Sequence, residues 1–176
     1  MKLIKRYQFF LITVIIMLVL LTINRQTGIK AIRITGYSFK EMALVIPPVF
    51  VLLGLLDVWV PREVMIRYMG ESSGLLGIFL AVLLGSAAAG PLYGAFPVAA
   101  VFMKKGVKFT NVLIFIGAWS TTKIPMFLFE MSALGARFAI TRLLVDIPGI
   151  IIIAYILTSF VTKDEINEIY KKAEML

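Results

Sequence analysis

Residues 75–103 read LLGIFLAVLLGSAAAGPLYGAFPVAAVFM and bear most directly on the architecture. These 29 residues carry no charged side chain. A helix needs about 20 mostly apolar residues to cross a bilayer, so the stretch is longer than one span and shorter than two. Gly90-Pro91 and Pro97 interrupt it, with Gly94 between them. The stretch therefore predicts either one long broken helix or two half-helices that meet in a re-entrant hairpin.

The composition of the whole chain places it in a membrane. Of its 176 residues, 60% are hydrophobic and 16% are charged, whereas a soluble domain is about half apolar and about a quarter charged. The mean hydropathy is +0.96. The net charge of +8 comes from short basic clusters between apolar runs, which is typical of membrane flanks. We expect an all-α, multi-pass protein of the inner (plasma) membrane, with the lipid bilayer as partner and no nucleic acid.

The residue types that are missing limit the chemistry. The chain has no Cys and no His. This removes thiolate nucleophiles, disulfides, the commonest general base and the commonest metal ligand. No phosphate-binding loop, catalytic triad or pair of carboxylates takes their place. We expect no enzymatic activity, no catalytic residue, no metal site and no cofactor.

The first apolar segment is residues 7–23, and it follows Lys2, Lys5 and Arg6. A signal peptide begins in a similar way. No small-residue cleavage site follows the segment, however, and Asn24-Arg25-Gln26 closes it. We interpret the segment as a retained transmembrane helix.

The next part of the chain is mixed. Residues 25–41 are basic, contain two glycines and predict a loop or a short helix in the membrane interface. Residues 42–60 predict a second span, which Pro47-Pro48 should kink. Pro61 then suits the first turn of a short helix that ends near Gly70.

Two apolar segments and a polar tail complete the chain. Residues 112–129 and 143–161 predict spans, and Thr162 lies three residues before Glu165, which is a capping-box pattern. We therefore expect two domains: a transmembrane domain, residues 1–161, and a short amphipathic tail helix, residues 162–176.

The distribution of Lys and Arg leaves the number of spans open between four and five. If residues 75–103 cross once, there are five spans, and seven basic residues face ten across the membrane. If they form a hairpin, there are four spans, and eleven face six with both termini in the cytoplasm. The positive-inside rule favours the hairpin. The near balance of the five-span arrangement, however, is what a protein inserting in both orientations would show.

Two interruptions of apolar sequence are the candidate binding site. Backbone groups freed by a broken helix must pack inside protein or line a wet cavity, and interrupted segments often mark a transporter's binding site. The alternative is that each is an ordinary proline kink. The candidate substrate-binding residues are Gly90, Pro91, Gly94, Pro97, Ser120, Thr121, Thr122, Lys123 and Pro125.

Lys123 is the most informative single residue, because it lies near the middle of an apolar segment. A cation at that depth is costly, faces the protein interior and usually has a partner. We expect Glu130 or Asp146 to form an ion pair with it or to carry a proton, although Asp146 could instead pair with Arg142, four residues earlier. The alternative for Lys123 is a structural ion pair or a place at the interface.

Small residues recur at intervals of three and four before the first interruption. On a helix this spacing places them on one face, where two backbones can approach closely. We interpret this stripe as a helix-packing surface. Its members are Gly74, Gly77, Ala81, Gly85 and Ala88.

Taken in order, these motifs resemble a family of predicted permeases that includes the organoarsenical efflux permeases. The resemblance covers roughly residues 28–155. Its most specific part is residues 85–125, and it implies a membrane transporter. The motifs are DVWVPRE from Asp57, Met69-Gly70, GPLYGAFPVAA from Gly90, a basic loop at Gly106 and TTKIP from Thr121.

Two departures from that family matter. Its arsenical members resemble one another in a cysteine-bearing motif where this chain has Gly94-Ala95-Phe96, so thiol ligation of arsenic is not expected. Full-length members look like two related halves, and this chain resembles one of them. A homodimer is therefore expected, antiparallel if it is to reproduce inverted repeats.

The sequence thus favours a permease for a small solute or ion that acts as a dimer of half-transporters. The competing hypothesis is a membrane assembly or interaction subunit that transports nothing. In that case the helix breaks and Lys123 would be packing devices.

Overall fold

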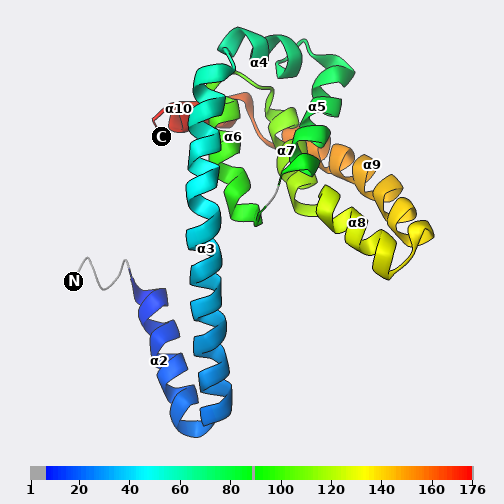
Figure 1. Cartoon of the computed structure of the whole chain (residues 1–176). Coiled ribbons are helices and arrows are strands. Elements are labelled where there is room, and N and C mark those ends of the chain that lie inside the picture. The colour runs from blue at the N-terminus through cyan, green and yellow to red at the C-terminus, as the bar shows by residue number, and fades with distance from the viewer. Residues whose placement is uncertain (1–6, 89, 176) are drawn as a thin grey trace. The chain divides into compact units, whose positions relative to one another are not determined.

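The computed structural model describes residues 7–88 and 90–175, without the side chains of residues 45, 46, 49, 50, 52, 53, 56 and 57. Lys2, Lys5 and Arg6 therefore lie outside the described residues, as does the side chain of Asp57. The regular elements of the described chain are all helices, which confirms the all-α prediction (Figure 1). They are α2 (Gln8–Ile23), α3 (Arg25–Trp59), α4 (Arg62–Met69), α5 (Gly74–Ala87), η1 (Leu92–Gly94), α6 (Ala95–Lys104), α7 (Phe109–Thr121), α8 (Ile124–Ala133), α9 (Ala136–Phe160) and α10 (Lys163–Glu174).

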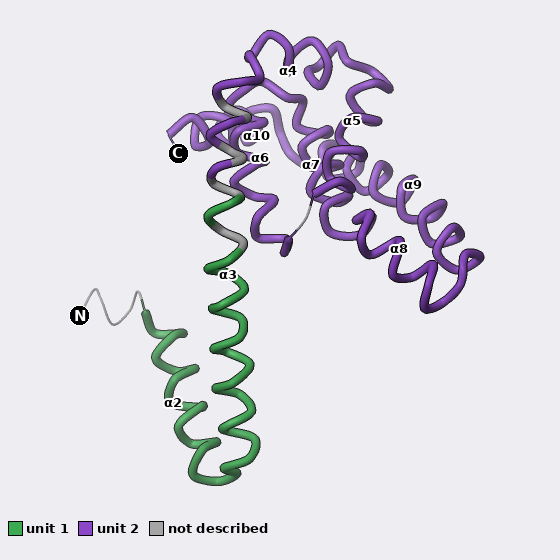
Figure 2. Tube along the Cα trace, viewed as in Figure 1, with its two compact units in different colours: residues 1–48 green, residues 49–176 purple. Residues whose placement is uncertain are grey.

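The chain divides into two compact units, residues 1–48 and residues 49–176 (Figure 2). In the first unit, α2 and the beginning of α3 approach each other at Gly28. A Cβ atom added to Gly28 would lie 2.7 Å from the Cα atom of Leu21. Gly28 therefore has a packing role, because a larger residue would separate the two backbones.

The structure corrects the prediction for residues 25–41. They form neither a loop nor a short separate helix, because α3 runs without interruption from Arg25 to Trp59. Pro47 and Pro48 lie inside this helix and do not end it. Each proline removes one backbone donor, yet the residues on both sides of the pair are helical. The two glycines in residues 25–41 do not stop the cooperative extension of a long helix.

The length and composition of the described helices bear on the predicted number of membrane spans. Two helical stretches of the described residues are long and apolar enough to cross a membrane, Phe109–Ala133 and Ala136–Phe160. The pair α4 and α5, which is bent by 110°, would make a third if it counts as one span. The segments Gln8–Ile23 and Leu92–Lys104 are apolar but shorter. A count of four or five spans is therefore not confirmed.

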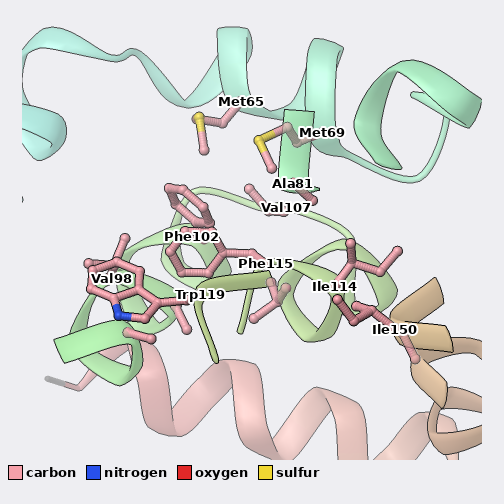
Figure 3. Packing of buried hydrophobic residues seen from close by; sticks show 14 residues of the cluster. Met65, Met69, Ala81, Val98, Phe102, Val107, Ile114, Phe115, Trp119 and Ile150 are labelled. Carbon is pink, nitrogen blue, oxygen red and sulfur yellow. The ribbon is translucent and has the colours of Figure 1, made fainter. Parts of the chain in front are cut away.

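The core of the second unit is centred on α7, which packs against α5, α6 and α9. Three aromatic rings meet there, and Figure 3 shows them side by side. The ring centroids of Phe102 and Phe115 are 4.8 Å apart, and those of Phe115 and Trp119 are 5.5 Å apart with an edge-on arrangement. Such pairs contribute about 0.5–1.5 kcal/mol beyond burial. These contacts pack α6 against α7.

The small-residue stripe is confirmed as a packing surface in its middle, but not at Gly74, which is exposed and has open space around an added Cβ atom. Gly77, Ala81 and Gly85 are buried where α5 meets α7. A Cβ atom added to Gly85 would lie 2.5 Å from the carbonyl oxygen of Phe115. The close approach of α5 and α7 therefore depends on the missing side chain, and it sets the position of the chain that follows α5.

The predicted short helix after Pro61 is confirmed as α4, which ends at Met69 just before Gly70. Its sharp turn into α5 is held by Asn111 of α7, whose side chain is buried. The amide nitrogen Nδ2 of Asn111 lies 2.9 Å from the carbonyl oxygen of Met69 and 3.2 Å from the hydroxyl of Ser73. A buried polar side chain thus satisfies the end of one helix and the start of the next.

The predicted capping box is also confirmed, at the start of α10. The hydroxyl of Thr162 accepts a hydrogen bond from the backbone N–H of Glu165, whose carboxylate accepts the N–H of Thr162. The backbone hydrogen bond from Thr162 lowers the pKa of Glu165, and the hydroxyl of Thr162 lowers it further. α10 packs against α6, and the Tyr170 hydroxyl donates to the carbonyl of Val107. Burial, with the charge of Glu71, raises the pKa of Tyr170 to about 12.

Candidate functional site

The two interruptions that the sequence singled out lie next to each other. The α-helix stops at Ala87 and resumes at Ala95, with Gly90 at a φ of 107°. A second gap separates α7 from α8 at Thr122 and Lys123. The ammonium group Nζ of Lys123 donates a hydrogen bond to the carbonyl oxygen of Gly90. One interruption therefore contacts the other directly. We call the region around Gly90, Thr122 and Lys123 the break junction.

A second donor strengthens the break junction from α7. The indole nitrogen Nε1 of Trp119 lies 3.3 Å from the carbonyl oxygen of Gly90 and 3.2 Å from that of Pro91. Buried carbonyl groups need hydrogen-bond donors, and a break in a helix leaves such groups without their usual partner. Lys123 and Trp119 supply these donors. Trp119 was not among the residues predicted from the sequence.

A third freed carbonyl belongs to Thr121, at the end of α7. Its helical partner would be the N–H of Pro125, which proline lacks. The guanidinium nitrogen Nη2 of Arg142, on α9, donates to this carbonyl instead. Arg142 therefore links α9 to the break junction. The sequence showed it only as a possible partner of Asp146, four residues later.

Arg142 also lies between two carboxylates. Its Nε atom is 3.0 Å from Oε2 of Glu130, on α8, and its Nη2 atom is 3.5 Å from Oδ2 of Asp146. Within the described residues, both acids thus pair with Arg142 and not with Lys123. The alternative pairing of Asp146 with Arg142, considered from the sequence, is the one present. We call these three residues the carboxylate cluster.

Burial within the carboxylate cluster is uneven. The side chain of Glu130 is 8% exposed, compared with 22% for Arg142 and 27% for Asp146. Although Arg142 Nε is 3.0 Å away, Glu130 Oε2 accepts no hydrogen bond of suitable geometry from the described residues. A buried carboxylate oxygen without a donor is costly. Glu130 is therefore the least satisfied charged group among the described buried side chains.

Hydroxyl groups line an open groove beside the break junction. The hydroxyl of Thr122 lies 2.8 Å from that of Ser86, on α5. Both residues line a groove of about 210 Å³ between α5, α8 and α9, whose walls are otherwise apolar. The sequence analysis missed Ser86, although it is the sole Ser or Thr in residues 75–103. The groove could hold a small solute with one polar end.

The remaining predicted residues are placed less centrally. Gly94 is buried at the end of η1, and Pro97 is half-buried in the first turn of α6. Ser120 and Pro125 are exposed, and Thr121 uses its hydroxyl to bond Gly117 of its own helix. Within residues 7–88 and 90–175, no three acidic side chains gather closely enough to hold a metal ion.

Apolar helices long enough to cross a bilayer, with charged and hydroxyl groups gathered where helices stop, define a helical membrane protein. The model of the predicted permease family ArsP_1 matches residues 29–175. The chain belongs to this family, which confirms the resemblance drawn from the motifs. Membership of a predicted permease family indicates a membrane transporter. A comparison with curated proteins and one with solved structures found no match.

Proposed function

We propose that the chain is a permease that moves a small solute or ion across the inner membrane without chemical change. The observation that supports this proposal most strongly is the hydrogen bond from Lys123 to Gly90, which joins two interrupted helices. Lys123 is also the N-cap residue of α8, and the positive end of a helix adds to the attraction of its charge for anions. The break junction therefore suits an anionic group.

The proposed binding step is an exchange of partners at Lys123. In the structure its ammonium group is held by a backbone carbonyl, which a negatively charged group would outcompete because charged acceptors bind an ammonium more strongly. Thr122 and Ser86 lie at the adjoining groove and would take the polar end of the solute. The first break would be shaped by Gly90, Pro91, Gly94 and Pro97. The second would be shaped by Ser120, Thr121 and Pro125.

The proposed assembly is a homodimer of half-transporters, with residues 1–161 in the membrane as four or five spans and residues 162–176 as a tail. The resemblance to one half of a two-part family supports this assembly. An antiparallel pair would place two break junctions near the middle of the bilayer, as inverted repeats do.

One observation favours the competing function of an assembly subunit that transports nothing. The freed carbonyls of Gly90, Pro91 and Thr121 already have donors in the structure, from Lys123, Trp119 and Arg142. Donors of this kind are also what a purely structural helix break requires. The two functions differ in what the loss of the Lys123 charge would do.

The test is transport by the purified protein in proteoliposomes. Membrane currents are recorded on solid-supported membranes after concentration jumps of chloride, phosphate, acetate, sodium and potassium. We expect a current with at least one probe, lost in Lys123→Met and kept in Lys104→Met, a matched change at an exposed lysine. Lys123→Arg, which keeps the charge, should retain part of it. Silence with every probe, or equal currents in wild type and Lys123→Met, would overturn the proposal.

A further inference from the structure

We propose that the carboxylate cluster is a proton-binding site and that Glu130 carries the proton, so that the coupling ion of the transporter is H⁺. This inference rests on the proposed permease function. It is carried by one guanidinium shared between two carboxylates. It is also carried by the buried Oε2 atom of Glu130, which lies 3.0 Å from Arg142 Nε but accepts no hydrogen bond of suitable geometry from the described residues.

The charges in the cluster do not balance. Arg142 brings one positive charge, while Glu130 and Asp146 bring two negative charges. Arg142 also donates a hydrogen bond to the carbonyl of Thr121, so one guanidinium serves this carbonyl as well as the ion pairs with the two carboxylates. Buried charges are retained in proteins when they are paired and hydrogen-bonded. One proton on Glu130 makes the cluster neutral and leaves Arg142 and Asp146 as an ordinary pair four residues apart on α9.

Burial selects Glu130 and not Asp146 as the proton carrier. Glu130 has the more buried side chain and holds the unsatisfied oxygen. Asp146 is more exposed, so water can stabilise its charge. Taking up H⁺ converts the Glu130 carboxylate to a carboxylic acid, and its release to the aqueous phase on the opposite side restores the carboxylate. No other reactant is needed.

The neighbouring helices bring few other charges to Glu130. α7 has no charged residue between Phe109 and Thr121. α9 brings Arg142 and Asp146, and its Arg137 is exposed. Lys123 precedes Glu130 by seven residues on α8, which is about 10 Å along a helix axis, and it donates to Gly90. Arg142 is thus the one cation paired with Glu130 among the described residues.

Arg142 also provides the link to the solute site. It donates to the carbonyl of Thr121, and the next two residues, Thr122 and Lys123, belong to the break junction. When Glu130 is protonated, Arg142 is attracted to Asp146 and Thr121 alone. Proton binding and solute binding therefore act on the same interruption between α7 and α8, which is the physical requirement for coupling.

The test is pH-difference infrared spectroscopy of the full-length protein in lipid, without any solute. We expect a C=O stretching band of a buried carboxylic acid that appears on acidification. It should shift when the protein is labelled with ¹³C at glutamate side chains and stay when aspartate side chains are labelled. Glu130→Gln should abolish it, and Glu63→Gln, an exposed matched change in α4, should leave it. If the band shifts when aspartate side chains are labelled, or if no such band appears on acidification, the inference is overturned.

Labelling leaves the wild-type fold intact and assigns the band to a glutamate. Since Glu130 is the one buried glutamate among the described side chains, a misfolded Glu130→Gln variant does not affect the conclusion. A second measurement separates this inference from the permease itself. If a probe moves across wild-type proteoliposomes and an imposed pH gradient does not change its flux, proton coupling is wrong and the permease stands. If the band belongs to Glu130 and no probe moves, both transport and coupling are wrong.

Discussion

The ammonium group of Lys123 donates a hydrogen bond to the backbone carbonyl of Gly90, 33 residues earlier in the chain. Gly90 follows α5 and Lys123 precedes α8, so this contact connects two places where regular helices stop. The close packing of α5 on α7 positions both of them. A polar contact between two helix breaks is thus built on a packing surface made of small residues.

Replacing Lys123 with Met should lower the free energy of unfolding by about 1.5 kcal/mol, since a hydrogen bond to a charged donor contributes about 1.5–3 kcal/mol and this side chain is half-buried. The carbonyl of Gly90 would keep Trp119 as a weaker donor. Thermal unfolding in detergent measures the change. Lys104→Met is the control and should unfold like the wild type, and equal loss in both variants would contradict the assigned contact.

Gly85→Ala should destabilise the second unit by about 1–3 kcal/mol, the usual cost of an added methyl group in a packed core. The new Cβ atom would lie 2.5 Å from the Phe115 carbonyl and 2.7 Å from the Cβ atom of Ala118. Gly149→Ala is the matched control, because no atom lies within 4 Å of its added Cβ. Denaturation of both variants under the same conditions measures the difference in their free energy of unfolding. Unchanged stability of Gly85→Ala would show that α5 and α7 are not in such close contact.

Asn111→Ala should cost about 1–3 kcal/mol, because it removes the buried donor that serves Met69 and Ser73. The carbonyl of Met69 would keep the backbone N–H of Lys108 as a donor, at 2.9 Å. We expect the turn between α4 and α5 to loosen. Distances between pairs of spin labels on the two helices would broaden, and the native absence of Cys simplifies the labelling. Asn167→Ala, at an exposed site in α10, should leave these distances unchanged.

The start of α10 should depend on pH through Glu165. Because hydrogen bonds from Thr162 lower the pKa of Glu165, the contribution of its carboxylate is fully present above the ordinary carboxyl pKa. It is lost as the pH falls through the lowered pKa. Amide hydrogen exchange of the first turn of α10 at several pH values measures this loss. Glu165→Gln keeps a capping side chain without the titration, so its exchange should not follow the same pH dependence.

Much of the architecture could be predicted because its causes are local. Pro61 and Gly70 bound α4, the capping box begins α10, and Gly90-Pro91 separates α5 from α6. Each of these depends on residues within one or two turns. The prediction for residues 25–41 was wrong for the opposite reason. The extension of α3 across them is a cooperative property of a long helix, and the two glycines there do not prevent it.

The candidate site was predicted in part. Lys123, Thr122 and Gly90 lie together as expected of interrupted segments, but the partners of each group did not follow from the sequence. Two carboxylates, Glu130 and Asp146, could pair with Lys123 or Arg142. Spacing along the chain supported just the pair Arg142 and Asp146. The pairing of Glu130 with Arg142 depends on how α8 and α9 pack after the turn at Gly135. The contact between the hydroxyls of Ser86 and Thr122 likewise depends on how the helices pack.

By itself, the sequence determined that the chain is a helical membrane protein, where most helices begin and end, and which residues interrupt them. These properties follow from hydropathy, missing backbone donors and capping, which act over a few residues. The tertiary structure decided that the two interruptions touch, that Lys123 bonds a carbonyl and that Arg142 holds both acids. Those contacts depend on distances between helices. The distances follow from how closely whole faces pack, as Gly85 against Phe115 shows.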